Sequence, residues 1–277
     1  MPRARVNGVE LFYETEGPVG GEPLVLVHGS WSDHLGWRFV LPRLARTYRV
    51  LAYDRRGHSR SERPAGPGSR REDEADLAAL IEMLGSGPVH VAASSFGAST
   101  ALGLAARRPG LLRSIMAHEP PLVAVVADRA ELRPVLEPMR AALGDVLAAL
   151  RSGGPEAAAR QFVEDVAVGP GAWEQLPDPV RRTFADNAPT FADEQADPDW
   201  AVLDVGRLGG FTGPVLLTTG TESPPWFPAI LDGVAGAFGG RVEQYTFEGA
   251  GHVPHLTHPE AYADRLETFI AGQSAVA

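Results

Sequence analysis

The feature that most constrains the fold is the alternation of short apolar segments with helical patterns along the chain. Apolar segments of this length are typical of strands that are covered on both faces. They lie at residues 24–27, 50–53, 89–92, 114–118, 215–219 and 242–247. Residues 3–16 come before them and predict a hairpin, because Asn7-Gly8 can supply the positive φ angles of a type I′ turn. We therefore expect an α/β fold with an eight-stranded, mainly parallel sheet flanked by helices.

One long helical stretch interrupts the alternation. Between the strand ending at His118 and the strand starting near Val215, roughly 95 residues show helical patterning and no clear strand. An apolar stripe predicts a helix over 132–150, although Pro134 and Pro138 should delay or kink its start. We interpret this stretch as a cap over the strand ends. The expected domains are a core of residues 1–119 and 211–277 and a helical cap of residues 120–210.

Two residue types are missing from the chain. It has no cysteine, and all 25 of its basic residues are arginine, so it has no lysine. Thiol nucleophiles, disulfides, thiolate metal sites and lysine Schiff bases are therefore excluded. Any catalysis must use Ser, His, Asp, Glu, Tyr, Arg or a bound metal.

The charge is acidic and unevenly distributed. The formal net charge is −10, which makes a nucleic-acid partner a poor expectation. Residues 156–204 hold eleven acids against three arginines, so most of the charge falls in the cap and should disfavour anionic substrates. No apolar stretch is long enough for a signal peptide or a membrane span. We expect a cytoplasmic protein that binds a small molecule and no membrane, and that could form a homodimer.

The segment Ala93-Ser94-Ser95-Phe96-Gly97 follows a strand and precedes a helix. A nucleophile in so sharp a turn needs small residues two positions before and after it. Ser95 meets this condition with Ala93 and Gly97, whereas Ser94 would have Phe96 as a flank. We therefore predict Ser95 as the nucleophile, with the backbone N–H of Phe96 as one oxyanion donor at the helix N-terminus.

Two further segments could complete such a site. After the strand at 24–27 the chain reads His28-Gly29-Ser30, and the backbone N–H of Ser30 is the predicted second oxyanion donor. Near the C-terminus, Gly251-His252 lies in a glycine-rich loop before a closing helix, and His252 is the predicted general base. His252 could also bind a metal with His255 and His258, but no carboxylate cluster accompanies them. We expect no metal and no cofactor.

Taken in order along the chain, these segments resemble the α/β-hydrolase superfamily. The segment 54–61, Asp-Arg-Arg-Gly-His-Ser-Arg-Ser, also resembles a loop of that family, with Ser59 in place of its second glycine. The resemblance implies a Ser–acid–His triad and acyl-transfer chemistry. A serine at the nucleophile position argues against the dehalogenase and epoxide hydrolase branches, which need a carboxylate there.

The triad acid is missing from the place where the family usually has it. In Thr219-Gly220-Thr221-Glu222-Ser223 the expected aspartate position holds Ser223. Glu222 is one residue early. Glu119 follows the strand after the nucleophile helix, where some family members carry their acid. We favour Glu119 and keep two alternatives, Glu222 and a dyad without a firm acid.

The predicted function is hydrolysis of an uncharged ester or lactone through an acyl-enzyme on Ser95, with Trp31 and Trp226 on the walls of an aromatic pocket. The same site could instead serve a perhydrolase of the haloperoxidase type, a C–C hydrolase or a lyase. A non-catalytic binding protein with this fold is a further alternative, because the acid is displaced.

Overall fold

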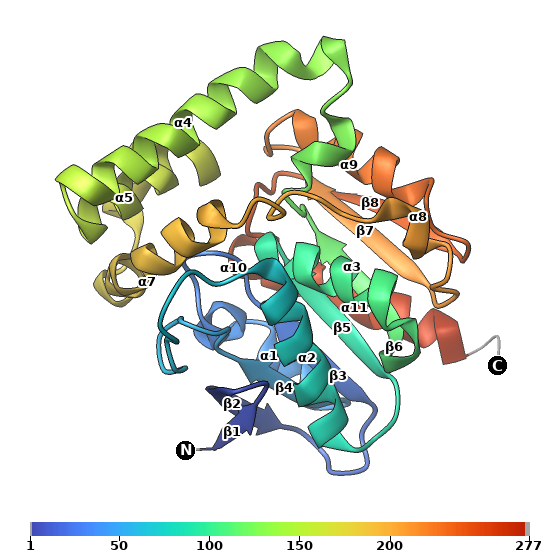
Figure 1. Ribbon diagram of the computed structural model, residues 1–277. Helices are drawn as coiled ribbons and strands as arrows, with labels where there is room; N and C mark the ends of the chain where they lie inside the picture. The colour runs from blue at the N-terminus through green and yellow to red at the C-terminus, as the bar shows by residue number, and fades with distance from the viewer. Residues whose placement is uncertain (1, 275–277) are drawn as a thin grey trace.

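The computed structural model describes residues 2–274 and contains one eight-stranded sheet (Figure 1). The strand order is β1-β2-β4-β3-β5-β6-β7-β8. The strands are β1 (Arg3–Val6), β2 (Val9–Glu16), β3 (Pro23–Val27), β4 (Arg49–Tyr53), β5 (Val89–Ser94), β6 (Leu112–His118), β7 (Val215–Gly220) and β8 (Val242–Phe247). Each expected strand is present, which confirms the α/β prediction.

The register separates a short antiparallel edge from a parallel remainder. β1 and β2 form the expected hairpin, in which Asn7 and Gly8 have φ angles of 46° and 79°. β2 pairs antiparallel with β4, and all later pairs are parallel. The carboxyl ends of β3, β5, β6, β7 and β8 therefore meet along one edge of the sheet, where ligands bind in open α/β folds.

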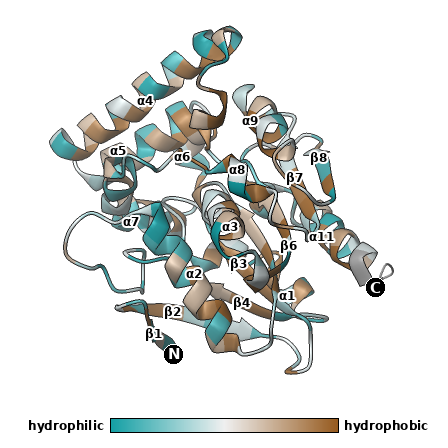
Figure 2. Ribbon diagram, turned by 45° about the vertical axis from the view of Figure 1, so that its right-hand side comes forward, coloured by the Kyte–Doolittle hydropathy of each residue, from teal (hydrophilic) through white to brown (hydrophobic). Residues whose placement is uncertain are grey.

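Helices cover both faces of the sheet. One face packs against α2 (Arg70–Leu84), α3 (Phe96–Arg107) and α9 (Trp226–Ala235), and the other against α1 (Leu41–Leu44) and α11 (Pro259–Ser274). In Figure 1, α2 and α3 lie in front of the sheet and α11 behind it. The central strands are mostly hydrophobic along their whole length in Figure 2, as burial on both faces requires.

The chain between β6 and β7 is helical, as predicted. Its elements are η3 (Val123–Val126), η4 (Ala130–Leu132), α4 (Arg133–Ser152), α5 (Pro155–Phe162), the π-helical turn η5 (Val163–Ala167), α6 (Ala172–Gln175), α7 (Asp178–Ala196) and α8 (Val205–Leu208). Three short elements lie elsewhere: η1 (His34–Trp37), η2 (Pro109–Leu111) and α10 (Pro254–Thr257). Pro134 lies in the first turn of α4, where it costs little, and Pro138 lies inside the helix without ending it.

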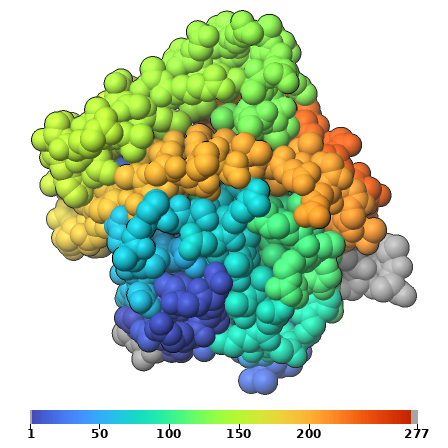
Figure 3. All heavy atoms as spheres, in the orientation of Figure 1, coloured from blue at the N-terminus to red at the C-terminus, as the bar shows by residue number. Residues whose placement is uncertain are grey.

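The cap has a hydrophobic cluster of its own. Val146, Ala158, Val163, Trp173 and Phe191 pack together there with a side chain from the core. Figure 3 shows the cap, from yellow-green to orange, as a continuous layer over the core. At its ends the insertion joins the core, because η3 packs against α9 and α8 against α3. The limits of 120 and 210 stay predictions. Among the described residues, no helix combines the length and the apolarity that crossing a bilayer needs.

Candidate active site

The turn after β5 presents Ser95 at the edge of the sheet. Ser95 has φ 54° and ψ −124°, so the backbone takes a positive φ between β5 and α3. Such a conformation costs about 1–3 kcal/mol in a non-glycine residue and clusters at functional sites. A Cβ at Gly97 would lie 2.4 Å from the carbonyl oxygen of His28. The turn therefore has no room for a side chain there, which agrees with the argument that selected Ser95 over Ser94.

The turn after β3 lies directly against Ser95. A Cβ at Gly29 would lie 2.8 Å from the Cβ of Ser95, so glycine lets the two turns approach. His28 holds this turn in place: its Nε2 accepts the backbone N–H of Arg55 at 2.9 Å, and its Nδ1 donates to the Gly29 carbonyl at 2.7 Å. Burial lowers the pKa of His28 well below its usual value, and the neutral ring can accept at Nε2 while donating at Nδ1.

Both predicted oxyanion donors belong to these turns. Ser30 follows Gly29, and Phe96 is the first residue of α3, where backbone N–H groups have no acceptor within the helix. Both residues line the cavity into which Ser95 opens. Binding of an oxyanion by their N–H groups stays a prediction that this arrangement supports.

Glu119 and His252 meet at the same edge of the sheet. Glu119 follows β6 directly, and His252 lies in the loop after β8. Nδ1 of His252 lies 2.6 Å from Oε2 of Glu119. The other carboxylate oxygen accepts the Thr219 hydroxyl at 2.7 Å and the Gly220 N–H at 3.0 Å. A fully buried carboxylate is thus fixed on one side and orients the imidazole on the other.

The carboxylate is charged at neutral pH. Burial alone would raise the pKa of Glu119, but the hydrogen bond from His252 and the neighbouring imidazoles lower it to about 2. His118 lies beside it, with Nε2 at 3.7 Å from Oε2, and burial lowers the pKa of His118 to about 4. His118 is therefore neutral at pH 7. The charge of Glu119 is left to stabilise a proton on His252.

Glu222 lies elsewhere. It is exposed, its backbone N–H donates to the Ala250 carbonyl, and within residues 2–274 no hydrogen bond joins its carboxylate to His252. The structure thus brings Glu119, and not Glu222, to the histidine. The catalytic role of Glu119 stays a prediction.

Two cavities meet at Ser95. They enclose about 620 Å³ and 710 Å³ of space, partly open to solvent, and Ser30, Ser95 and His252 line both. The first cavity is otherwise mostly apolar, and Gln195 is the further polar side chain among the described residues on its wall. Its apolar lining is Phe96, Pro121, Val123, Met139, Leu143, Phe162, Val166, Ala167, Phe191, Trp200, Pro224, Trp226 and Phe227. An uncharged substrate suits such walls.

The two tryptophans expected on the wall differ. Trp226 lines the first cavity. Trp31 does not, and that prediction needs correction: with φ 68° its side chain packs into the cap and is fully buried. Its ring lies 4.9 Å from the rings of Phe162 and Phe191, which themselves form the wall. Phe227 stacks on His252 at 5.3 Å and so borders the predicted base.

Two groups in the described part of the chain bring metal-ligating atoms within 4.8 Å of one another, namely His118-Glu119-His252 and Asp33-His34-Asp54. Glu119 already bonds to His252. In the second group, Asp54 accepts from the His34 ring at 2.5 Å, and Asp33 accepts from the backbone of η1. These contacts account for both groups as hydrogen-bonded networks. The trio of His252, His255 and His258 is not among them.

A polar stripe on α7 and just beyond its end was not predicted from the sequence. Asn187, Thr190, Glu194 and Asp197 follow one another at spacings of three, four and three, and all are buried. They bond to core residues in the loops after β3 and β4 and at the start of α2. The spacing was visible in the sequence, but polar residues at helical spacing ordinarily indicate a solvated face. Two acids of the negatively charged cap, Glu194 and Asp197, are therefore bonded to core groups.

The comparisons with known proteins agree with this fold. A model of the alpha/beta hydrolase family matches residues 24–265. The chain therefore belongs to this family.

Individual relatives are more distant. The chain is 36% identical over 125 residues to a non-heme chloroperoxidase of Streptomyces lividans, covering 44% of this chain and 45% of that protein. It thus spans less than half the length of such curated relatives. An alpha/beta hydrolase from Sphaerobacter thermophilus is similar in structure with a TM-score of 0.78 at 25% identity, covering 97% of this chain and 100% of that one. Est816, described as an N-acyl homoserine lactone degrading enzyme, gives a TM-score of 0.74 at 22% identity, with coverage of 97% and 100%.

Proposed function

We propose that this protein is a serine hydrolase that cleaves an uncharged ester or lactone through an acyl-enzyme on Ser95. The observation that carries the proposal is the hydrogen bond between His252 and the buried, charged Glu119, at a cavity that Ser95 and His252 share. Nucleophilic catalysis by serine needs a base within reach and a group that orients this base.

The acylation step follows from these positions. Because Nδ1–H of His252 donates to Glu119, its Nε2 is the free basic nitrogen and can take the proton from the Ser95 hydroxyl. The serine oxygen then attacks the carbonyl carbon of the substrate. The oxyanion that forms would accept hydrogen bonds from the backbone N–H groups of Ser30 and Phe96. His252 gives its proton to the leaving alkoxide, the C–O bond breaks, and an alcohol leaves.

Deacylation repeats these steps with water. His252 removes a proton from water, the hydroxide attacks the acyl carbon, and Ser95 regains the proton as the acid leaves. In a lactone the alcohol stays attached to the acyl group, so the product is one hydroxy acid. The negative charge of Glu119 stabilises the imidazolium in both halves, because its pKa of about 2 keeps it ionised.

The mostly apolar first cavity favours a substrate without charge. The match to a non-heme chloroperoxidase supports one alternative for the second half of the cycle, in which hydrogen peroxide replaces water and a peracid is released. Both reactions share the acyl-enzyme, so they differ only in the second nucleophile. Location in the cytoplasm and a small-molecule partner remain part of the proposal.

Labelling and turnover test this function. A fluorophosphonate should attach to Ser95, and Ser95→Ala should lose the label and at least about 10⁴-fold in activity on p-nitrophenyl esters. Ser94→Ala is the matched control, and it should keep both because Ser94 lies in β5 before the turn.

A panel of p-nitrophenyl esters, aliphatic lactones and acetate with hydrogen peroxide would then separate the reactions. No adduct on Ser95 in the wild type would defeat every version of the enzyme proposal and leave a binding protein.

A further inference from the structure

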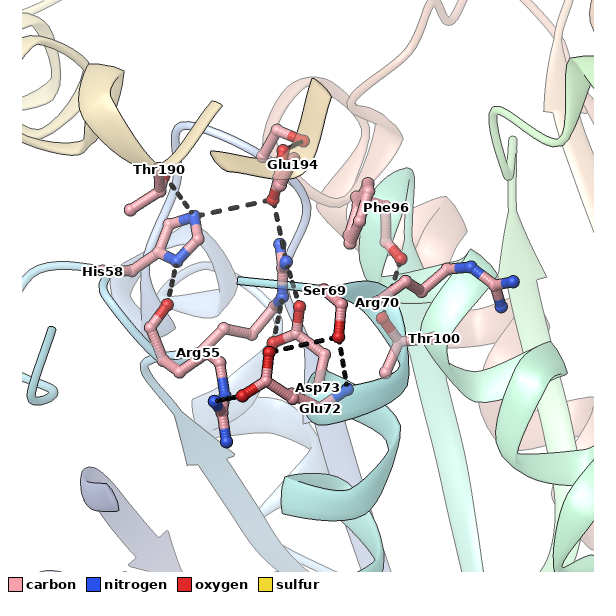
Figure 4. A network of polar contacts seen from close by, with 12 residues as sticks. Arg55, His58, Ser69, Arg70, Glu72, Asp73, Phe96, Thr100, Thr190 and Glu194 are labelled. Atoms are coloured by element: carbon pink, nitrogen blue, oxygen red, sulfur yellow. Dashed lines mark hydrogen bonds and ion pairs between the residues drawn. The ribbon is translucent and has the colours of Figure 1, made fainter. Parts of the chain in front are cut away.

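A buried ion pair joins the cap to the core close to the predicted oxyanion donors. Glu194 of α7 and Arg55 of the loop after β4 are 6% and 1% exposed. Nη2 of Arg55 lies 2.8 Å from Oε1 of Glu194. Arg55 also contacts Asp73 of α2 through Nε and Nη2, at 3.2 Å and 2.7 Å. Figure 4 shows Arg55 between the two carboxylates. Burying these charges costs free energy of desolvation, so we expect a role of the ion pair other than stability.

The second oxygen of Glu194 reaches the turn that carries one oxyanion donor. Oε2 accepts the hydroxyl of Ser30 at 2.5 Å, and Ser30 supplies the predicted N–H. About two turns earlier on α7, the side-chain amide of Asn187 donates to the backbone carbonyls of Trp31 and Ser32, at 3.3 Å and 2.9 Å. The cap helix therefore holds three consecutive residues of this turn.

Arg55 also contacts the other half of the oxyanion site. Its Cζ lies 4.5 Å from the centre of the Phe96 ring, and Phe96 supplies the second predicted N–H. The two side chains are drawn near each other in Figure 4. The backbone N–H of Arg55 donates to His28, which in turn bonds to Gly29. One arginine thus contacts or supports both turns that meet at Ser95.

We propose that Glu194 and Arg55 are positioning residues that set the two oxyanion donors, so that docking of α7 completes the oxyanion hole. Neither residue would touch the substrate carbonyl. Glu194 would fix the Ser30 turn through its hydroxyl, and Arg55 would fix Phe96 through its ring. This inference rests on the proposed function and adds a dependence of the chemical step on a cap residue.

Two substitutions break the link at different points. A glutamine at 194 has a single acceptor oxygen, so it cannot accept from Ser30 and Arg55 as the carboxylate does. Glu194→Gln should lower kcat by about tenfold to a hundredfold, since loss of a whole oxyanion donor costs about 10²–10³. Ser30→Ala removes only the hydroxyl and keeps the N–H, and it should lower kcat by about tenfold. In both variants KM should change less than about twofold.

A matched control separates positioning from general support of the cap. Asp197 follows α7 on the same stripe, and Oδ2 accepts the backbone N–H of Arg70 at 2.9 Å, away from both oxyanion turns. Asp197→Asn should leave kcat within about twofold of the wild type. Both changes break the same link. The kcat of the double variant Ser30→Ala/Glu194→Gln should therefore fall no further than that of the more impaired single variant.

The experiment measures kcat, KM and the affinity for an alkyl boronic acid, whose tetrahedral adduct on Ser95 carries a negative charge. Boronate affinity should fall with kcat in Glu194→Gln and Ser30→Ala and stay unchanged in Asp197→Asn. Three outcomes would overturn the positioning role: a change in KM without a change in kcat, additive losses of kcat in the double variant, or an equal loss of kcat in Asp197→Asn. Should Glu194→Gln not fold, Ser30→Ala alone decides. A wild type that neither turns over esters nor takes the fluorophosphonate would overturn the proposed function instead.

Discussion

Two buried carboxylates, Glu119 in the core and Glu194 in the cap, hold opposite sides of the same site by different means. Glu119 is fixed by a strand end: a backbone N–H and a hydroxyl bind one oxygen, and its own φ is 46°. Glu194 is fixed by side chains alone, from the core residues Arg55 and Ser30. Their pKa values move in opposite directions, since burial raises that of Glu194 while His252 helps lower that of Glu119.

The difference shows how each was built. A carboxylate whose pKa is lowered is bound by groups that favour its charge, which suits an acid that must stabilise an imidazolium. A carboxylate whose pKa is raised by burial loses hydration when it is covered, and its partners offset only part of that cost. This suits a contact that forms when the cap packs on the core. The core side of the site is thus preorganised by the sheet, and the cap side depends on packing.

The largest expected effect falls on the core side. Glu119→Gln should lower kcat by about 10³–10⁴-fold, because a neutral amide no longer stabilises the imidazolium or fixes the tautomer of His252. Glu222→Gln is the matched control and should keep wild-type activity, since Glu222 is exposed. Steady-state rates on one p-nitrophenyl ester measure both. Equal activity in the two variants would contradict the catalytic role of Glu119.

Because the pKa values of Glu119 and Glu194 shift in opposite directions, their contributions to stability should change with pH in opposite ways. Glu119 ionises at about 2 in the folded chain instead of 4.5, so its contribution to stability is present above pH 4.5 and is lost as pH falls toward 2. At about 1.4 kcal/mol per pH unit, the free energy of unfolding of the wild type relative to Glu119→Gln should fall by about 2 kcal/mol between pH 7 and pH 3.

For Glu194 the sign reverses. Its pKa is raised, so the folded state holds the proton more tightly than the unfolded state, and the contribution of the carboxyl falls as pH rises above 4.5. The wild type should therefore lose stability relative to Glu194→Gln over that range. Urea unfolding at several pH values measures both pairs, and a common sign would show that the two carboxylates do not differ as described.

A smaller effect on stability is expected at Asn187, which joins the cap to the core through uncharged hydrogen bonds. Asn187→Ala removes the bonds to Trp31, Ser32 and Ser59 and leaves buried carbonyls unpaired, which should destabilise the protein by about 1–3 kcal/mol. Hydrogen exchange should rise in α7 and in residues 30–32 and remain unchanged in β5. Faster exchange spread evenly over the sheet would mean that cap and core unfold as one unit.

Local patterns account for most of the core. The apolar segments predicted the strands with ends within about two residues, because central strands buried on both faces leave a continuous apolar signal. The edge strand β8 is the exception, since three of its six residues are exposed. The register of the elbow followed from the size of Gly97, since a Cβ there would collide with the backbone of His28. The expected delay in the start of the helix did not occur, because α4 begins at Arg133 and contains Pro138.

Other features depended on contacts that no local pattern records. The choice between Glu119 and Glu222 required the pairing of β6 with β7, which puts the Thr219 and Gly220 donors beside Glu119. Trp31 was predicted on the cavity wall, but its side chain packs in the hydrophobic cluster of the cap. Glu194 lies 139 residues from Arg55, and a polar stripe on a helix does not tell whether it faces water or a buried arginine.

The sequence by itself determined the sheet, the elbow, Ser95 as the predicted nucleophile and His252 as the predicted base. Each of these is written in short segments whose sterics or periodicity allow few conformations. Only the tertiary structure decided which carboxylate meets His252, which aromatic rings form the wall, and that an acidic cap helix bonds to the turn after β3. Those outcomes depend on burial, which sets whether a charge is solvated or paired and arises only when distant parts of the chain pack together.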